Sequence, residues 1–235
     1  MEPSRRPFLL PLLILLFLSS CSNVTPVLFR HPQPQGKKDL SAFPAAFRGT
    51  WRDEARDQTC YLTPNHIIIN KRSRLILSQE KFDTLMHELL PAGIPYERHD
   101  SSLIVDGEMI HVNMQNDSTV LYSTTHDTLF TVDASHPLRA YRGRLFLNRP
   151  RGGKWEVLVL ERQGKNGMVL SYLPSYSSVL EALRGITQVV EAEVPFIPLK
   201  EYVIDPTRKE LKEMLEQDLF RERLSLVRSS RDYPE

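Results

Sequence analysis

Trp155-Glu156-Val157-Leu158-Val159-Leu160-Glu161 is the stretch that decides the fold. Successive side chains of a β-strand point to opposite faces of its sheet. Val157 and Val159 therefore lie on one face of this strand, and Leu158 and Leu160 lie on the other. A strand that is apolar on both faces is typical of the centre of a sheet that is covered on both sides. We therefore expect a central, doubly covered strand here.

Further strand-forming segments lie on both sides of this stretch. Strands are expected at 139–147 and 168–173, and the turns at 149–153 and 164–167 contain glycine pairs or Asn-Gly. Asp106-Gly107 is a strong hairpin dipeptide. Thr119 to Ser123 and Thr128 to Val132 are expected as two strands separated by a polar turn.

Three segments have a helical pattern. Ser78 can cap a helix that runs to Leu90, and its apolar residues recur at helical spacing. A short helix is expected from Ser177 or Ser178 to Arg184, with Gly185 ending it. The run from Thr207 to Glu210 is a capping box at the start of a third helix.

These elements predict an α+β fold, in which two or three helices pack on a mostly antiparallel sheet. Partial closure of this sheet, as in calycin barrels, is left open. The globular domain is expected over residues 43–228 and a frayed tail over 229–235. Phe47-Arg48-Gly49 and Tyr141-Arg142-Gly143 each begin a strand-turn-strand run. This echo leaves open two related halves, 43–135 and 136–228, or chance similarity.

The N-terminus has the pattern of a secretion signal. Arg5 and Arg6 precede a brief apolar run from Pro7 to Leu18, and small residues follow. The run is shorter than the roughly 20 apolar residues of a membrane-spanning helix. We therefore expect residues 1–20 to be a signal peptide.

Leu18-Ser19-Ser20-Cys21 resembles the lipobox of bacterial lipoproteins. The resemblance implies that Cys21 carries acyl chains such as palmitate, and that the chain is cleaved just before it. It implies a protein held in the cell envelope. An aspartate directly after the lipidated cysteine would retain the protein in the inner membrane. This chain has Ser22 there, which favours the outer membrane, facing the periplasm. An ordinary secretion signal with an incidental Cys21 is the alternative.

Residues 21–42 are expected to be a lipidated cysteine followed by a flexible tether, because Pro26, Pro32, Pro34 and Gly36 interrupt any regular pattern. An ordered strand through Val27-Leu28-Phe29 is the alternative. Loss of residues 1–20 would leave equal numbers of basic and acidic residues. A chain with zero net charge has no overall positive field to attract nucleic acid.

The candidate contact residues are four arginines, Arg142, Arg144, Arg149 and Arg151. Arg142 and Arg144 are expected to share a strand face. The cluster can contact lipid phosphates or another envelope protein, or it can protect a solvated sheet edge from aggregation. Gly49-Thr50-Trp51 resembles the Gly-x-Trp of lipocalins, which implies a ligand cavity at Trp51. A core aromatic is the alternative.

No catalytic motif is present in the sequence. His87-Glu88 lacks the second histidine of a zinc-protease motif, and Cys60 lies among residues typical of a buried strand. We expect no metal and no cofactor. The run from Tyr141 to Asn148 and the Asp205 to Glu210 helix start also resemble uncharacterised envelope lipoproteins of the Bacteroidota, which brings no activity with it. The expected function is a non-enzymatic binding or scaffold module, with a calycin-like carrier or an envelope enzyme as alternatives.

Overall fold

The computed structural model describes residues 25–89, 96–99, 102–105, 108–115, 118–193 and 200–229. Its helices are α2 (Gln79–Leu89), α3 (Ser177–Ile186) and α4 (Arg208–Glu216). Its strands are β1 (Leu28–Phe29), β2 (Asp39–Leu40), β3 (Gly49–Asp53), β4 (Gln58–Leu62), β5 (His66–Ser78), β6 (Tyr96–His99), β7 (Ser102–Val105), β8 (Glu108–Gln115), β9 (Ser118–Thr131), β10 (Leu138–Tyr141), β11 (Arg144–Arg151), β12 (Lys154–Gln163), β13 (Gly167–Tyr172), β14 (Val189–Glu193), β15 (Lys200–Ile204) and β16 (Arg221–Arg228).

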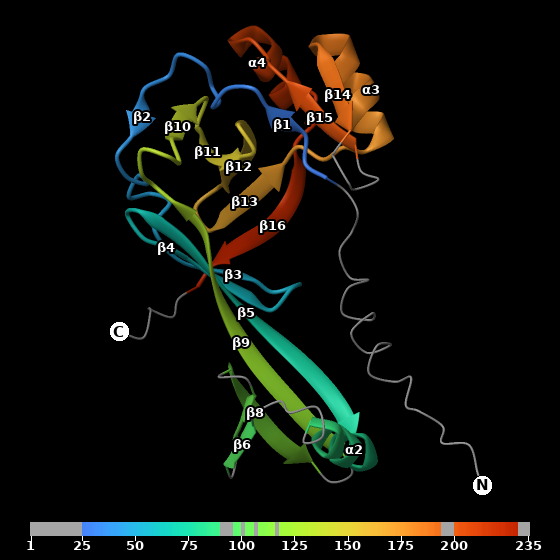
Figure 1. Cartoon of the computed structure of the whole chain (residues 1–235). Coiled ribbons are helices and arrows are strands. Elements are labelled where there is room, and N and C mark those ends of the chain that lie inside the picture. Colours follow the sequence, from blue (N-terminus) through green and yellow to red (C-terminus); the bar gives the residue numbers. More distant parts are fainter. Residues whose placement is uncertain are drawn as a thin grey trace, which may run out of the picture.

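All of these strands belong to one mostly antiparallel sheet (Figure 1). The strand order is β14-β15-β1-β12-β13-β16-β3-β4-β5-β9-β8-β7-β6, and β11, β10 and β2 branch from β12. This order does not return to its start within the described residues. The sheet is therefore open, and the described strands do not form the closed barrel of a calycin. The α+β class with a dominant antiparallel sheet is confirmed.

The predicted central strand is β12, and its two faces border two different cores. β11 pairs along one edge of β12, and β1 and then β13 pair along the other edge. Leu158 and Leu160 belong to one buried cluster, whereas Val157 and Val159 belong to a second. None of these four side chains is more than 3% exposed. The prediction from the alternating pattern is confirmed.

The two cores share β11 and β12 and otherwise contain different elements. The first contains inward side chains of β3, β4, β5, β9, β10, β11, β13 and β16. The second joins Phe29 and Phe146 to apolar residues of α3 and α4. Thr207 and Glu210 form the predicted capping box of α4, in which Thr207 Oγ1 accepts from Glu210 N at 3.3 Å.

The start and end of α3 differ from the expectation. Tyr176, rather than a serine, is the N-cap, and the helix passes through Gly185 to Ile186. Val179, Leu180 and Leu183 are buried in the second core. Packing of this apolar face extends the helix past the glycine, because burial of a helix face outweighs the roughly 1 kcal/mol that glycine costs in a helix.

The expected flexible tether over residues 21–42 is wrong for residues 25–42. Val27, Leu28 and Phe29 are no more than 1% exposed, and β1 pairs with both β12 and β15. Asn148 also fixes Gln33: Gln33 N donates to Asn148 Oδ1 at 2.6 Å, and Asn148 Nδ2 donates to Gln33 O at 2.9 Å. Burial of three apolar residues therefore orders a proline-rich segment. Cys21 and residues 1–24 lie outside the described residues, as do 230–235 of the expected tail.

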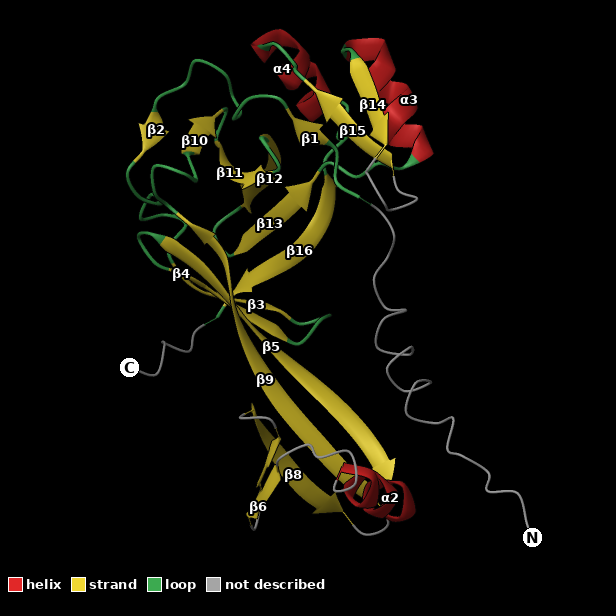
Figure 2. Cartoon of the chain, in the orientation of Figure 1, coloured by secondary structure: helices red, strands yellow, loops and turns green. Residues whose placement is uncertain are grey.

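A long arm, whose two longest strands are β5 and β9, extends from the body (Figures 1 and 2). β5 and β9 pair from His66↔Thr131 to Ser78↔Ser118, and α2 and β6 to β8 lie at the far end. The expected turn at Thr124 to Asp127 is wrong, because β9 continues through it. Threonine is favourable in strands, and these residues pair with β5 along the arm.

Gly49 and Gly143 occupy different places, although both follow an aromatic-Arg step. Gly49 begins β3, whereas Gly143 lies in the turn between β10 and β11. A single sheet spans both expected halves. Among the described residues, no helix is both long and apolar enough to span a membrane.

We expect Asn148→Ala to lower the free energy of unfolding by about 1–3 kcal/mol, because it leaves the buried Gln33 backbone groups unpaired. Urea unfolding of wild type and variant measures this. Asn113→Ala is the matched control, because Asn113 is exposed and its loss should change the free energy by at most about 0.5 kcal/mol. Equal losses in both variants would contradict the role of Asn148.

Candidate functional site

The four predicted arginines separate into two pairs at opposite ends of β11. Arg142 and Gly143 have φ angles of 52° and 78° and form the two-residue turn between β10 and β11. Positive φ at both positions is the conformation that tight hairpin turns require. The expectation that Arg142 and Arg144 share a strand face is therefore wrong.

Each arginine at this turn end has an acidic neighbour. Arg142 Nη2 lies 3.5 Å from Glu216 Oε1, and Arg144 Nε donates to Glu161 Oε2 at 2.7 Å. Because both ion pairs are accessible to solvent, they contribute little to stability. This end of β11 therefore offers no free group of basic side chains.

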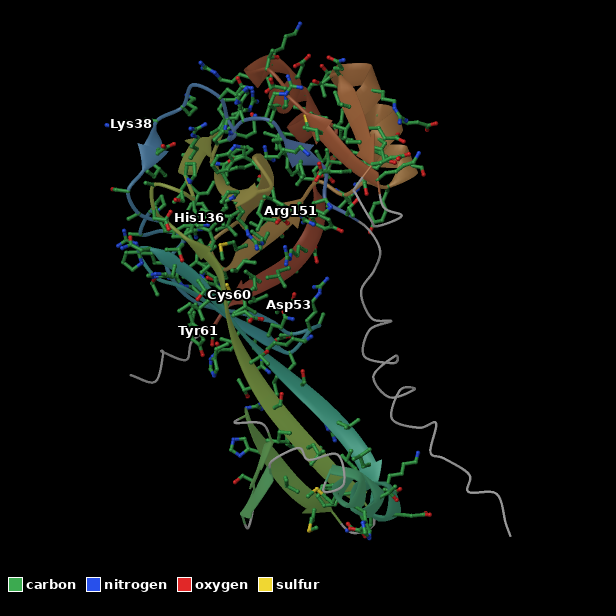
Figure 3. The ribbon with its side chains drawn as sticks, viewed as in Figure 1. Lys38, Asp53, Cys60, Tyr61, His136 and Arg151 are labelled. Carbon is green, nitrogen blue, oxygen red and sulfur yellow. The ribbon has the colours of Figure 1, made fainter. Side chains whose placement is uncertain are left out.

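The other two arginines lie at the hairpin end of β11. Arg149 follows Leu147 by two residues and so projects on the face of the first core, whereas Arg144 projects on the face of Phe146. Arg151 is exposed on the body (Figure 3), and it forms no ion pair with any described residue. Of the four arginines, Arg144 lines a small pocket, whereas Arg149 lines a larger concave surface.

That concave surface is a cavity of about 500 Å³, which we call the basic hollow. Four cationic side chains line it from separate strands and turns: Arg56, Lys71, Arg149 and Arg223. Its apolar lining is Ile69, Leu129 and Leu224. Of these residues, the sequence predicted only Arg149 as a contact, because the others lie far apart in the chain and share no local pattern.

Two carboxylates pair with the arginines of the basic hollow. Asp53 is 1% exposed, and its Oδ2 accepts from Arg56 Nη1 at 2.7 Å. Glu156 Oε2 lies 3.6 Å from Arg149 Nη1, and its Oε1 lies 3.8 Å from Arg223 Nη1. The last two distances exceed a hydrogen bond. Arg149 and Arg223 therefore keep donors for another acceptor.

Trp51 lies in the first core and is fully buried. Its Nε1 donates to Phe47 O at 2.9 Å, and the Arg228 guanidinium lies 5.2 Å from the ring centroid. A buried indole with a satisfied N–H and a cation over its ring is typical of a structural tryptophan. This is the position of a core aromatic.

Cys60 is buried on β4, within the first core (Figure 3). Burial raises the pKa of its thiol to about 12. The reactive form of cysteine is the thiolate, so Cys60 is unreactive near neutral pH.

The histidine and acidic residues form small local contacts. His136 Nδ1 lies 2.9 Å from Asp133 Oδ1 across an exposed turn, and this hydrogen bond lowers the pKa of Asp133. His126 Nδ1 lies 2.8 Å from Asn70 Oδ1. No three His, Cys, Asp or Glu side chains in the described part of the chain come together to hold a metal ion.

The arm carries a feature that sequence analysis missed: one edge of β5. Arg72 N donates to Asp57 O at 3.4 Å, but from Ser73 to Ser78 the described pairings of β5 are with β9 alone. Leu75 and Ile76 on this edge are 43% and 55% exposed. The alternation of the segment alone does not show whether one or two neighbouring strands are present.

No protein-family model, curated protein or solved structure matches this chain.

We expect Cys60 to react with Ellman's reagent only after the chain unfolds, because its pKa of about 12 leaves almost no thiolate at pH 8. The absorbance of the released thionitrobenzoate measures the reaction in native buffer and in 6 M guanidinium. The control is Thr125→Cys, which places a thiol on the exposed part of β9 and should react at once. Equal rates for both thiols in native buffer would contradict burial.

Proposed function

We propose that this protein is a lipid-anchored binding module of a bacterial cell envelope, and that the β5 edge accepts a β-strand of a partner protein. The observation that carries the proposal is the exposed edge from Ser73 to Ser78 with Leu75 and Ile76 on it. A strand edge with free N–H and C=O groups is a template for an added strand.

The order of strands in the arm supports this proposal. Along Ser73 to Ser78, β5 is the outer strand of the run β5-β9-β8-β7-β6. Leu121 and Val120 of β9, which pair with Leu75 and Ile76, are buried, whereas Leu75 and Ile76 are exposed. A strand added beside β5 would cover Leu75 and Ile76 and would extend this sheet by one strand.

The charge of the edge indicates the chemistry of the partner. Arg72 and Arg74 are the only charged residues between Arg72 and Ser78. Both are exposed, and Arg74 lies 6.0 Å from the ring centroid of Tyr122. Cations at an edge prevent pairing with a second copy of the same basic edge. The preferred partner strand therefore has acidic side chains opposite these arginines and apolar ones opposite Leu75 and Ile76.

The body would serve as the rigid base for this contact. In the proposed arrangement, α3 and α4 pack over one face of the sheet, as their shared cluster with Phe146, Val157 and Val159 supports. Trp51 is fully buried among apolar side chains of the first core, which favours a binding module over a carrier that holds a hydrophobic ligand around this residue. The anchor of the module is Cys21, in the outer membrane facing the periplasm.

A photo-crosslinking amino acid at position 76 tests the edge contact in living cells. We expect one discrete crosslinked species with the protein expressed in its native host, because the side chain at this position would lie in the interface. The control position is Thr125, which is exposed on β9. Loss of the species on Leu75→Lys supports the proposal, and identical crosslinks from both positions, or none from position 76, contradict it.

Metabolic labelling with an alkyne fatty acid tests the anchor. We expect wild type to take up the label and Cys21→Ala to take up none, because acylation requires the thiol. Cys60→Ala is the matched control: it also removes a thiol, but one that is buried, and it should keep the label. Equal labelling of wild type and Cys21→Ala would disprove the lipoprotein assignment without affecting the edge contact.

A further inference from the structure

We propose that the basic hollow binds an organic phosphate whose ester group is apolar. This site is separate from the proposed partner edge, because its lining lies on the body, on β5 before Ser73, and on residues 127–129 of β9. The cavity of about 500 Å³ falls in the range of small-molecule sites.

Three cations in the hollow have unused donors. Arg149 and Arg223 approach the two oxygens of Glu156 at 3.6 and 3.8 Å, and neither guanidinium donates a hydrogen bond to a described residue. Lys71 has no ion pair with any described residue. Each guanidinium carries five N–H donors. One shared carboxylate therefore leaves most of these donors available.

The neighbouring charges favour an anion over a cation. Arg56, Lys71, Arg149 and Arg223 line the hollow, and Asp127 is the one acidic side chain in its lining. Arg56 is held by Asp53 at 2.7 Å, and Glu156, which pairs with the other two arginines, is only 12% exposed. The three arginines thus line the cavity, whereas Asp53 and Glu156, the carboxylates that balance them, are not among its lining residues.

The number of donors and the apolar lining select the ligand class. A phosphate monoester carries close to two negative charges and three acceptor oxygens, which suits three separate cations better than a single carboxylate does. Ile69, Leu129 and Leu224 give the same cavity an apolar wall next to the first core. An ester group that contacts this wall would add affinity beyond that of inorganic phosphate.

The strands that carry the cations fix the spacing between them. Arg149 is on β11, Lys71 on β5 and Arg223 on β16, so three strands of one sheet fix the spacing of the three groups. Groups on strands keep their positions better than groups on loops. The hollow is therefore available without a large rearrangement of the chain.

Titration calorimetry with hexyl phosphate tests the proposal on the mature chain purified in dodecyl maltoside. We expect saturable binding by wild type, weaker binding of inorganic phosphate and of hexanoate, and none of 1-hexanol. Arg149→Gln should lower the affinity for hexyl phosphate by about tenfold or more, as expected for loss of a charge-assisted contact. Lys71→Gln should weaken it also, and this variant removes no ion pair within the described residues.

Arg144→Gln is the matched control, because Arg144 lies on the same strand and also has a carboxylate partner but faces the other core. It should bind hexyl phosphate like wild type. Absence of saturable binding by wild type, or equal loss in Arg144→Gln and Lys71→Gln, overturns the site. Binding of hexanoate as tight as that of hexyl phosphate overturns the assignment of phosphate.

Binding to lipid vesicles distinguishes a lipid headgroup from a soluble phosphate ester as the ligand. Wild type and Lys71→Gln are compared on phosphatidylcholine vesicles with and without phosphatidic acid, the lipid whose headgroup is itself a phosphate monoester. A preference for phosphatidic acid that Lys71→Gln loses assigns the site to a lipid headgroup. Equal vesicle binding by both proteins, together with weaker hexyl phosphate binding by Lys71→Gln, assigns it to a soluble phosphate ester.

Discussion

Two apolar faces on one strand are the constraint from which the structure follows. Val157, Leu158, Val159 and Leu160 are almost fully buried, and burial of such a side chain stabilises a fold by about 1.5–3 kcal/mol. Exposure of either face would thus cost several kcal/mol, a large part of a typical net stability. The chain must therefore cover β12 twice. Leu158 and Leu160 share a buried cluster with side chains of neighbouring strands, and Val157 and Val159 share another with residues of β1, α3 and α4.

Features with local causes were predictable from the sequence. The alternating residues of β12, the glycine pair at 152–153 and the capping box at Thr207 each act through neighbours in the chain. β1 was not predictable in this way, since Phe29 pairs with Trp155 and Leu28 with Val203. Proline content suggested mobility there, but burial against distant residues determines the outcome. The arm was missed for the same reason, because each half of β9 depends on pairing with β5.

The candidate sites show the same division. A run of arginines is visible in the sequence, but the turn at Arg142 and the alternation of β11 divide it between two faces. The basic hollow instead combines Arg149 with cations contributed by the β3–β4 turn, β5 and β16. Sequence spacing carries no information about such a group. The open edge of β5 is also a property of the assembled sheet, because it depends on where β4 stops pairing.

The ordered N-terminal segment has a consequence for orientation. Thr25 Oγ1 contacts Ser175 Oγ at 3.1 Å and donates to Lys200 O at 3.4 Å, so the first described residue is already fixed to the body. If Cys21 is acylated as proposed, the four residues that follow it span at most about 14 Å when fully extended. A body on so short a connection would rest beside the lipid headgroups with the Ser175 and Lys200 side nearest to them. Its height and tilt over the bilayer would then be restricted by the fold itself.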